Sequence, residues 1–339
     1  MLNSLALPLL LTIACQGGQS APSAPNQAAK PPLPASRTQP LPPVIGAEAW
    51  YTVQPGDTLL RIARRYGTDR LTLAQLNHLT RQRPRPGTRL LLPTRFILPA
   101  QPQEGCVLNI PERGVYVFRH GQFLARYPTA VGRPSWPTPT GTFKVECKIQ
   151  DPIFEAPEAM VRREGARRTL IPPGPRNPLG DRWMGWSGCQ VGFHSTPTLT
   201  SIGRAASHGC VRLYPEAGHR MFGQVRVGMP IYSLYQPVKI GQEGNRYYLS
   251  VSPDIYHRGL ASLAYVEQRL KKLGLLPIVD LEKVREVVAL QDGYPHCIGE
   301  APKPTEQEAP APTSSQPEPN PDAPPAEPEP EGDNDATSR

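Results

Sequence analysis

The sequence lacks an apolar run long enough to span a bilayer. Its N-terminal apolar stretch, Leu5 to Ala14, has ten residues, whereas a transmembrane helix needs about 20. A short apolar run followed by small and polar residues is typical of an export signal. We therefore expect residues 1–15 to be a signal peptide and the mature chain to carry no transmembrane helix.

Basic residues are also missing from the start of this stretch, before Cys15. The segment Thr12-Ile13-Ala14-Cys15 resembles the signal of bacterial lipoproteins, in which the cysteine is lipidated after cleavage. Leucine is commoner than threonine at the first of these positions. Two outcomes stay open for the mature N-terminus: a lipid anchor at Cys15, or simple cleavage.

Large apolar residues are scarce in two proline-rich stretches, Ala21 to Pro43 and Ala301 to Pro330. Such segments cannot bury enough surface to offset the entropy lost on ordering. We expect a disordered linker at residues 16–48 and a disordered acidic tail at residues 300–339. The remaining length fits about two domains.

Acidic residues are unevenly spread. Residues 301–339 hold nine acids and two bases, a charge of −7, so the rest of the chain carries +15 and the whole chain +8. A basic body attracts nucleic acid or an anionic envelope polymer. No nucleic-acid motif is visible, so we expect an envelope partner and no nucleic acid. A merely solvated basic surface is the alternative.

Cysteines number six, and one of them, Cys210, ends a histidine-containing stretch from Phe193 to Arg212 (FHSTPTLTSIGRAASHGCVR). A thiol becomes a nucleophile when a base takes its proton and backbone donors await an oxyanion. The alternatives are a buried structural cysteine and a zinc site. A zinc site is disfavoured because the usual paired ligand spacing is missing, so we expect no metal and no cofactor.

Three spaced motifs resemble the L,D-transpeptidase (YkuD-type) catalytic domain. They are the Ser-His-Gly-Cys turn ending at Cys210, with His194 sixteen residues before that cysteine, Thr138-Pro139-Thr140-Gly141, and Asn177-Pro178-Leu179-Gly180. The resemblance covers roughly Cys106 to Leu234. It implies a cysteine acyltransferase that acts on peptidoglycan.

The resemblance also implies roles within the site. Cys210 would be the nucleophile and His194 the base, and the N–H groups of Gly209 and Cys210 would bind the oxyanion. His208 would either orient His194 or shape the oxyanion pocket. Ser207 would complete the catalytic set. As substrate contacts we expect Arg212, with a plain surface arginine as the alternative, and Ser195, which stands where many relatives have glycine.

A smaller module is predicted at residues 49–94. Strand, helix, helix and strand patterns follow one another there, with turn chemistry at Pro55-Gly56 and a helix stop at Gly67. The segment Tyr51 to Leu59 (YTVQPGDTL) resembles a LysM module, a family that binds peptidoglycan or chitin glycan. The resemblance places Gly56, Asp57 and Thr58 in the glycan groove. In the alternative, Asp57 and Thr58 only cap the first helix.

The fold class we expect is multi-domain. A small α+β LysM module (βααβ) is followed by a mainly β catalytic domain at residues 104–236, a sandwich or barrel, because short strands alternate with Gly and Pro turns. A lid is expected within Glu146 to Gly192, with Trp183 and Trp186 either lining a peptide cleft or packing the lid. Residues 237–299 should form a short, largely helical C-terminal addition without chemistry of its own.

The expected function is that of a peptidoglycan L,D-transpeptidase of the bacterial envelope, with stem peptides and glycan strands as partners. An L,D-carboxypeptidase, with water as the acceptor, and a non-catalytic binding or anchoring protein are the alternatives. In an oxidising compartment, cysteines other than the nucleophile can form disulfides or stay buried as thiols; the candidates are Cys106, Cys147, Cys189 and Cys297.

Overall fold

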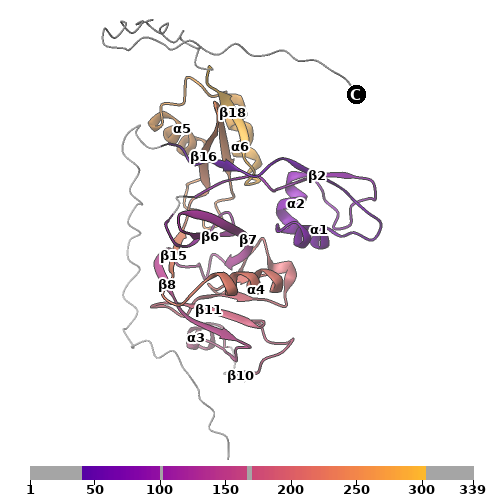
Figure 1. Cartoon of the computed structure of the whole chain (residues 1–339), viewed down its shortest axis with the longest axis vertical. Helices are drawn as coiled ribbons and strands as arrows, with labels where there is room; N and C mark the ends of the chain where they lie inside the picture. The colour runs from indigo at the N-terminus through magenta and orange to yellow at the C-terminus, as the bar shows by residue number, and fades with distance from the viewer. Residues whose placement is uncertain (1–39, 100–101, 166–169, 303–339) are drawn as a thin grey trace, which may run out of the picture. The chain divides into compact units, whose positions relative to one another are not determined.

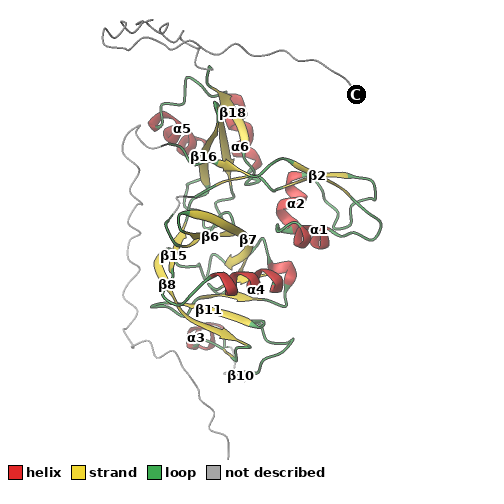
Figure 2. Cartoon of the chain, in the orientation of Figure 1, coloured by secondary structure: helices red, strands yellow, loops and turns green. Residues whose placement is uncertain are grey.

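The computed structural model describes residues 40–99, 102–165 and 170–302 (Figures 1 and 2). The predicted signal peptide with Cys15, most of the predicted linker and nearly all of the predicted tail lie outside the described residues. Among those described, no helix combines the length and the apolar character needed to cross a membrane.

The N-terminal module has the predicted βααβ order. Its helices begin where side chains cap them: Thr58 Oγ1 accepts from the N–H of Arg61 (3.1 Å), and Asp69 Oδ1 accepts from that of Thr72 (2.9 Å). The cap at Asp69 starts the second helix at Arg70. The elements are β2 (Ala49–Thr52), α1 (Leu59–Arg65), α2 (Arg70–Leu76) and β3 (Arg89–Leu92).

The central domain is a closed β-barrel. Within the described residues, nine strands form one sheet in the order β13-β7-β14-β12-β11-β8-β15-β5-β6, and β6 pairs with β7 to close it. The strands are β5 (Gly105–Asn109), β6 (Gly114–Arg119), β7 (Gln122–Gly132), β8 (Gly141–Gln150), β11 (Arg182–Trp186), β12 (Gly192–Ser195), β13 (Ala205–Ser207), β14 (Val211–Leu213) and β15 (Pro230–Leu234). This confirms the predicted mainly β domain.

The barrel interior is apolar. Its core includes Val117, Met184, Trp186, Phe193 and Ile231, each fully shielded from solvent. Trp186 packs between Phe143 and Phe193, with ring centroids 5.1 and 5.0 Å away. Trp186 therefore neither lines a cleft nor packs the lid: it belongs to a barrel strand and fills the core.

An insertion between β8 and β11 forms the lid region. Its elements are β9 (Phe154–Glu155), α3 (Glu158–Glu164) and β10 (Leu170–Ile171), and β9 pairs with β10. The buried Asn177 holds the base of the insertion, because its Nδ2 donates to the carbonyl of Pro152 (2.7 Å) and to that of Ile171 (3.2 Å). One amide thus fastens both sides of the lid.

Two further helices follow barrel strands along the chain: η1 (Leu199–Ser201), a 3₁₀ turn after β12, and α4 (Pro215–Gln224), after β14. Helix α4 packs on β11 and β12 and was not expected from the sequence. It starts with a proline at the first helical position, where a missing N–H costs nothing.

The C-terminal subdomain combines a sheet with two helices (Figure 2). The expected helices are present, and a three-stranded sheet beside them makes the subdomain α+β. Its elements are β16 (Val238–Glu243), β17 (Arg246–Val251), α5 (Leu263–Lys272), α6 (Leu281–Leu290) and β18 (His296–Glu300).

Two short strands and a buried ion pair connect this subdomain to the rest. Strand β1 (Val44–Ile45), at the end of the segment expected to be a linker, pairs with β4 (Phe96–Ile97), and Pro43 forms a bridge to Gln242 of β16. Val44 is buried, which explains its order. The ammonium of Lys239, on β16, lies 2.9 Å from the carboxylate of Glu112 at the β5–β6 turn.

Candidate active site

The turn from Ser207 to Cys210 joins β13 to β14 and is fixed from within. The Oγ of Ser207 donates to the carbonyl of Cys210 (2.5 Å) and accepts from the N–H of Gly209 (3.1 Å). Gly209 has φ +108°, a conformation that favours glycine. Because Ser207 engages the N–H of Gly209, that group has to exchange partners before it can bind an oxyanion.

The Cys210 thiol lies half-buried at the start of β14, and its Sγ is 3.9 Å from the carbonyl oxygen of Gln190. Burial raises the pKa of Cys210 to about 11, against the opposing effects of the Gly192 N–H and the Arg212 charge. The resting group is a thiol and needs a base to become a nucleophile.

His194 lies on β12, 3% exposed. Its Nδ1 is 2.6 Å from the carbonyl oxygen of Ser195. A carbonyl only accepts, so the proton sits on Nδ1 and Nε2 is left as an acceptor. Burial lowers the pKa of His194 to about 4, which keeps the ring neutral.

Strand register places His194 and Cys210 on adjacent segments of the sheet. Strands β12 and β14 are parallel neighbours, with His194 opposite Arg212. Cys210 precedes Arg212 by two residues, just before β14 begins, and the N–H of Gly192 on β12 acts on its thiol. The imidazole and the thiol are thus offset by two residues across neighbouring strands, and general-base activation of the nucleophile requires contact between them.

Ser195 fits its position because two glycines face it. A β-carbon on Gly218 of α4 would lie 2.4 Å from Ser195 Oγ, and one on Gly180 would lie 2.7 Å from Ser195 Cβ. The Ser195 side chain is therefore accommodated by α4 and by the last residue of the Asn-Pro-Leu-Gly motif. Its backbone carbonyl, the acceptor for His194, is held in place by this packing.

His208 faces the lid. Its Nε2 lies 2.9 Å from Glu164 Oε2 at the end of α3 and 3.1 Å from Arg133 Nη2. Trp136 packs edge-on against its ring, 5.3 Å between centroids. The carbonyl that orients His194 comes from Ser195, so a catalytic role for His208 stays a prediction.

Arg212 lies on β14 beside the site and is partly buried, which lowers its pKa; the Cys210 sulfur acts in the opposite direction. Its predicted contact with substrate stays a prediction. Within the described residues, no group of three or more His, Cys, Asp or Glu side chains is placed to hold a metal ion. The five described cysteines are all free thiols.

The three residues predicted for the glycan groove lie on the β2–α1 loop of the module. Asp57 is buried and accepts from Tyr51 Oη (2.6 Å) and from the N–H of Gln54 (2.9 Å). These bonds lower its pKa. Thr58 caps α1, whereas Asp57 fastens the loop to β2. A glycan contact for Gly56, Asp57 and Thr58 stays a prediction.

Sequence reasoning missed other residues of the site. Thr138 appeared only as part of a quoted motif, yet its Oγ1 donates to the carbonyl of Gly209 (2.8 Å). Glu164, Gly218 and Tyr256 gave no signal, because each reaches the site from an element distant along the chain.

The fold and this site define a class of protein: a closed β-barrel that carries a thiol beside a neutral histidine, preceded by a small βααβ module. Family models match both parts, the L,D-transpeptidase catalytic domain at residues 104–240 and the LysM domain at residues 51–93. Together, these two domains imply binding to peptidoglycan.

Relatives agree with this class. The probable L,D-transpeptidase YcfS of Escherichia coli is 31% identical over 231 residues, which cover 63% of this chain and 72% of that protein. The probable L,D-transpeptidase ErfK/SrfK of Salmonella typhimurium is 28% identical over 76% of this chain and 89% of its own length. The chain belongs to the L,D-transpeptidase family, and both predicted resemblances are confirmed.

A solved L,D-transpeptidase from Mycobacterium smegmatis is also similar. It has a TM-score of 0.33 and 20% sequence identity, and the match covers 58% of this chain and 95% of that one.

Proposed function

We propose that this chain is a peptidoglycan L,D-transpeptidase of the bacterial envelope that acts through a thioester on Cys210. The observation that carries the proposal is the 2.6 Å contact between His194 Nδ1 and the carbonyl oxygen of Ser195, which assigns the proton to Nδ1 and leaves Nε2 to accept one. In this division of the chain, residues 49–94 tether it to glycan, residues 104–236 perform the chemistry and residues 237–299 form the C-terminal subdomain.

The first half-reaction forms the thioester. Nε2 of His194 takes the thiol proton as Cys210 Sγ attacks the carbonyl between the third stem residue, a diamino acid, and D-alanine. The N–H of Cys210, joined by that of Gly209 once it leaves Ser207, stabilises the oxyanion. His194 then returns the proton to the departing amine, and D-alanine leaves.

The second half-reaction consumes the thioester. An acceptor amine from a neighbouring stem attacks the carbonyl, His194 takes a proton from that amine, and Cys210 leaves as a thiol when the proton is returned. The product is a crosslink. Water in place of the amine would release a free stem, which is the carboxypeptidase alternative.

Mass spectrometry of disaccharide tetrapeptides incubated with the purified protein tests the proposal. We expect release of D-alanine together with a dimeric product, both lost in Cys210→Ala and retained in Cys189→Ala, a matched cysteine outside the turn. Activity that survives Cys210→Ala overturns the mechanism. Release without dimers indicates the carboxypeptidase, and binding without release indicates an anchoring protein.

A further inference from the structure

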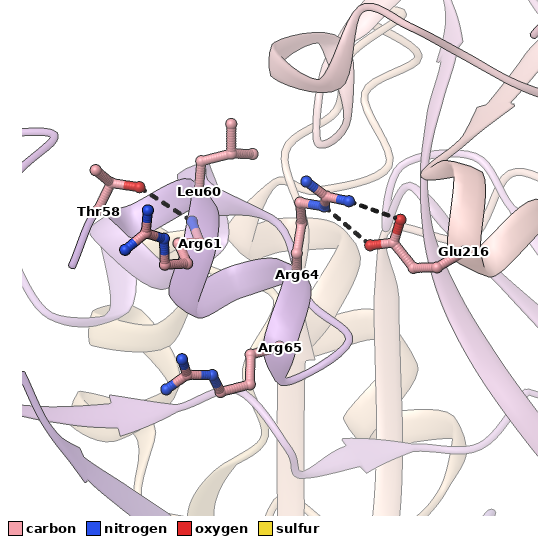
Figure 3. A pocket seen from close by; sticks show the side chains of 6 residues that line it. All are labelled: Thr58, Leu60, Arg61, Arg64, Arg65 and Glu216. Carbon is pink, nitrogen blue, oxygen red and sulfur yellow. Dashed lines mark hydrogen bonds and ion pairs between the residues drawn. The ribbon is translucent and has the colours of Figure 1, made fainter. Parts of the chain in front are cut away.

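A groove lies along α1 of the LysM module, and Figure 3 shows part of it. It consists of two hollows of about 430 and 450 Å³ that share Thr58 and Leu60. Each also includes one residue of the barrel domain, Glu216 in the first and Thr200 in the second. The remaining lining residues are Arg61, Arg64, Arg65, Arg70, Gln82 and Arg83.

Positive charge dominates this groove. It contains five guanidinium groups and one carboxylate, Glu216, which pairs with Arg64 through two hydrogen bonds of 2.9 and 3.0 Å (Figure 3). Arg70 is bonded to the neutral amide of Gln82 (3.0 Å). Among the described residues, only Arg64 of the five has a carboxylate within ion-pair distance.

The module cannot neutralise this charge itself. Residues 51–93 contain eight arginines, no lysine and two acids, Asp57 and Asp69. Both acids are buried and bonded within the module. A neutral hexosamine chain does not require such a field, whereas guanidinium groups pair with carboxylates and phosphates in bidentate geometry.

We propose that this groove binds the carboxylates of uncrosslinked stem peptides, so that the module recognises charged stems in addition to glycan. This inference rests on the proposed function. The stem carboxylates are favoured over phosphate-bearing polymers because the groove is partly walled by Thr200 and Glu216 of the domain that processes stems.

Binding measurements on the full chain carrying Cys210→Ala test this inference. Arg61→Ser/Arg83→Ser should weaken binding of a disaccharide tetrapeptide by about tenfold, with a smaller salt dependence. Arg85→Ser/Arg89→Ser removes the same charge outside the groove lining and should leave binding within about twofold. The catalytic cleft is common to both variants and cancels in the comparison.

Three further ligands distinguish binding of stem carboxylates from binding of glycan or of phosphate. Chitotetraose and a carboxyl-amidated tetrapeptide should bind equally well to both double variants. If the two double variants bind the charged tetrapeptide alike, or if only a phosphate polymer distinguishes them, the inference is wrong. Turnover by the unmodified protein is a separate readout, so the groove can fail while the proposed function stands.

An independent observation concerns Tyr256, between β17 and α5. Its hydroxyl donates to the carbonyl of Gly132 (2.8 Å) and accepts from the N–H of Thr138 (3.0 Å). The ring of Tyr256 stacks on the ring of Tyr235 with centroids 5.3 Å apart, and the backbone N–H of Tyr256 donates to the hydroxyl of Tyr235 (2.7 Å). A residue of the C-terminal segment thus closes the 132–138 loop of the barrel.

That loop holds the nucleophile turn. The hydroxyl of the buried Thr138 accepts from the N–H of Gly132 and donates to the carbonyl of Gly209, each at 2.8 Å. The Gly209 carbonyl and the Cys210 N–H belong to one planar peptide and point in opposite directions. Holding the carbonyl at Thr138 therefore aims the Cys210 N–H away from the loop.

We infer that Tyr256 is a positioning residue for the oxyanion donor of Cys210. The C-terminal subdomain, which carries no chemistry of its own, then acts on the reaction through Tyr256 and Thr138. This inference also rests on the proposed function, because an oxyanion donor matters only if acyl transfer occurs.

Kinetics of Tyr256→Phe test it, with Tyr265→Phe on α5 as the control within the same subdomain. We expect kcat to fall about tenfold with KM nearly unchanged in Tyr256→Phe, because an oxyanion donor acts in the transition state. The control should keep wild-type kcat. A lowered Tm with unchanged kcat in Tyr256→Phe would show a purely structural role and overturn the inference. Absence of turnover by the wild-type protein would instead refute the proposed function.

Discussion

The carbonyl oxygen of Ser195 fixes the tautomer of His194, whose Nδ1 lies 2.6 Å away. The imidazole is neutral, with a pKa of about 4, and the Cys210 thiol has a pKa of about 11. The pair therefore rests as thiol and imidazole. A thiolate–imidazolium ion pair would require the opposite order of pKa values.

A pH profile follows from this order. Because His194 loses its base function only when protonated, kcat/KM should stay level as pH falls through 6.5 and decline near pH 4, about tenfold per unit below it. Alkylation of Cys210 by iodoacetamide should rise steadily from pH 6 to 10. A plateau of alkylation at neutral pH would contradict this, and circular dichroism at each pH controls for unfolding.

Gly218→Ala should displace Ser195 and with it the carbonyl that orients His194. The added β-carbon would lie 2.4 Å from Ser195 Oγ, and overpacking of this kind costs about 1–3 kcal/mol. We expect a lower free energy of unfolding and a lower kcat, measured by urea denaturation and D-alanine release. Ser195→Gly in the same chain removes the obstructing hydroxymethyl and should restore both; failure to do so would place the damage elsewhere in α4.

Glu164 should control access to the site. Its carboxylate bonds to His208 and pairs with Arg133, and the bond from His208 is the main reason that its pKa is lowered. Glu164→Gln should raise KM about three- to tenfold with a smaller change in kcat, because substrate then meets a loosened lid.

The control for the lid is Glu158→Gln, at the other end of α3, where the carboxylate pairs, among the residues that the structure describes, only with the exposed Arg162. It should leave KM unchanged. As pH falls and Glu164 becomes protonated, the KM of the wild type should approach that of Glu164→Gln. Equal KM values for the two proteins at pH 7 would exclude a role for the contact between Glu164 and His208.

Lys239→Met should destabilise the junction between barrel and C-terminal subdomain. Burial alone would raise the pKa of Glu112, but Lys239 and Arg126 outweigh it and hold that pKa at about 2. Removing one partner of a buried pair costs about 3–5 kcal/mol. Urea denaturation should show this loss, whereas Lys283→Met, on an exposed lysine of α6, should change stability by less than about 0.5 kcal/mol.

The same pair predicts a pH dependence of stability. The pKa of Glu112 is depressed on folding, so its contribution is complete above its ordinary value of 4.5 and is lost as pH falls from there toward 2. Wild-type stability should fall over this window more steeply than that of Lys239→Met. Parallel pH curves for the two proteins would contradict the assignment.

Local signals carried the sequence predictions. The βααβ module was predictable because its turns and helix caps lie within a few residues of the elements they end, as Thr58 does for α1. Helix α6, in the segment expected to be largely helical, begins in the same local way, because Asp280 caps it. In the barrel, Gly and Pro turns predicted short strands but not their partners.

Long-range contacts could not be predicted from the sequence. Tyr256 reaches Thr138 across 118 residues, and no periodic pattern marks either residue. Helix α4 was missed because its buried face consists of Ala217, Gly218 and Met221, which includes only one large apolar side chain. Cys210 and His194 could be singled out because their residue types are chemically distinctive, whereas the groups that hold them are ordinary backbone carbonyls and hydroxyls.

The place of β15 in the barrel has a consequence for how the protein folds. This strand lies between β5 and β8, with Ile231 opposite both Cys106 and Phe143. The chain is synthesised from its N-terminus, so Cys210 is made before β15. Pairing of β15 with β5 and β8, which lie far before it in the sequence, is slow to form. The nucleophile is therefore synthesised before the barrel can close, and its activation waits for the last barrel strand to pair.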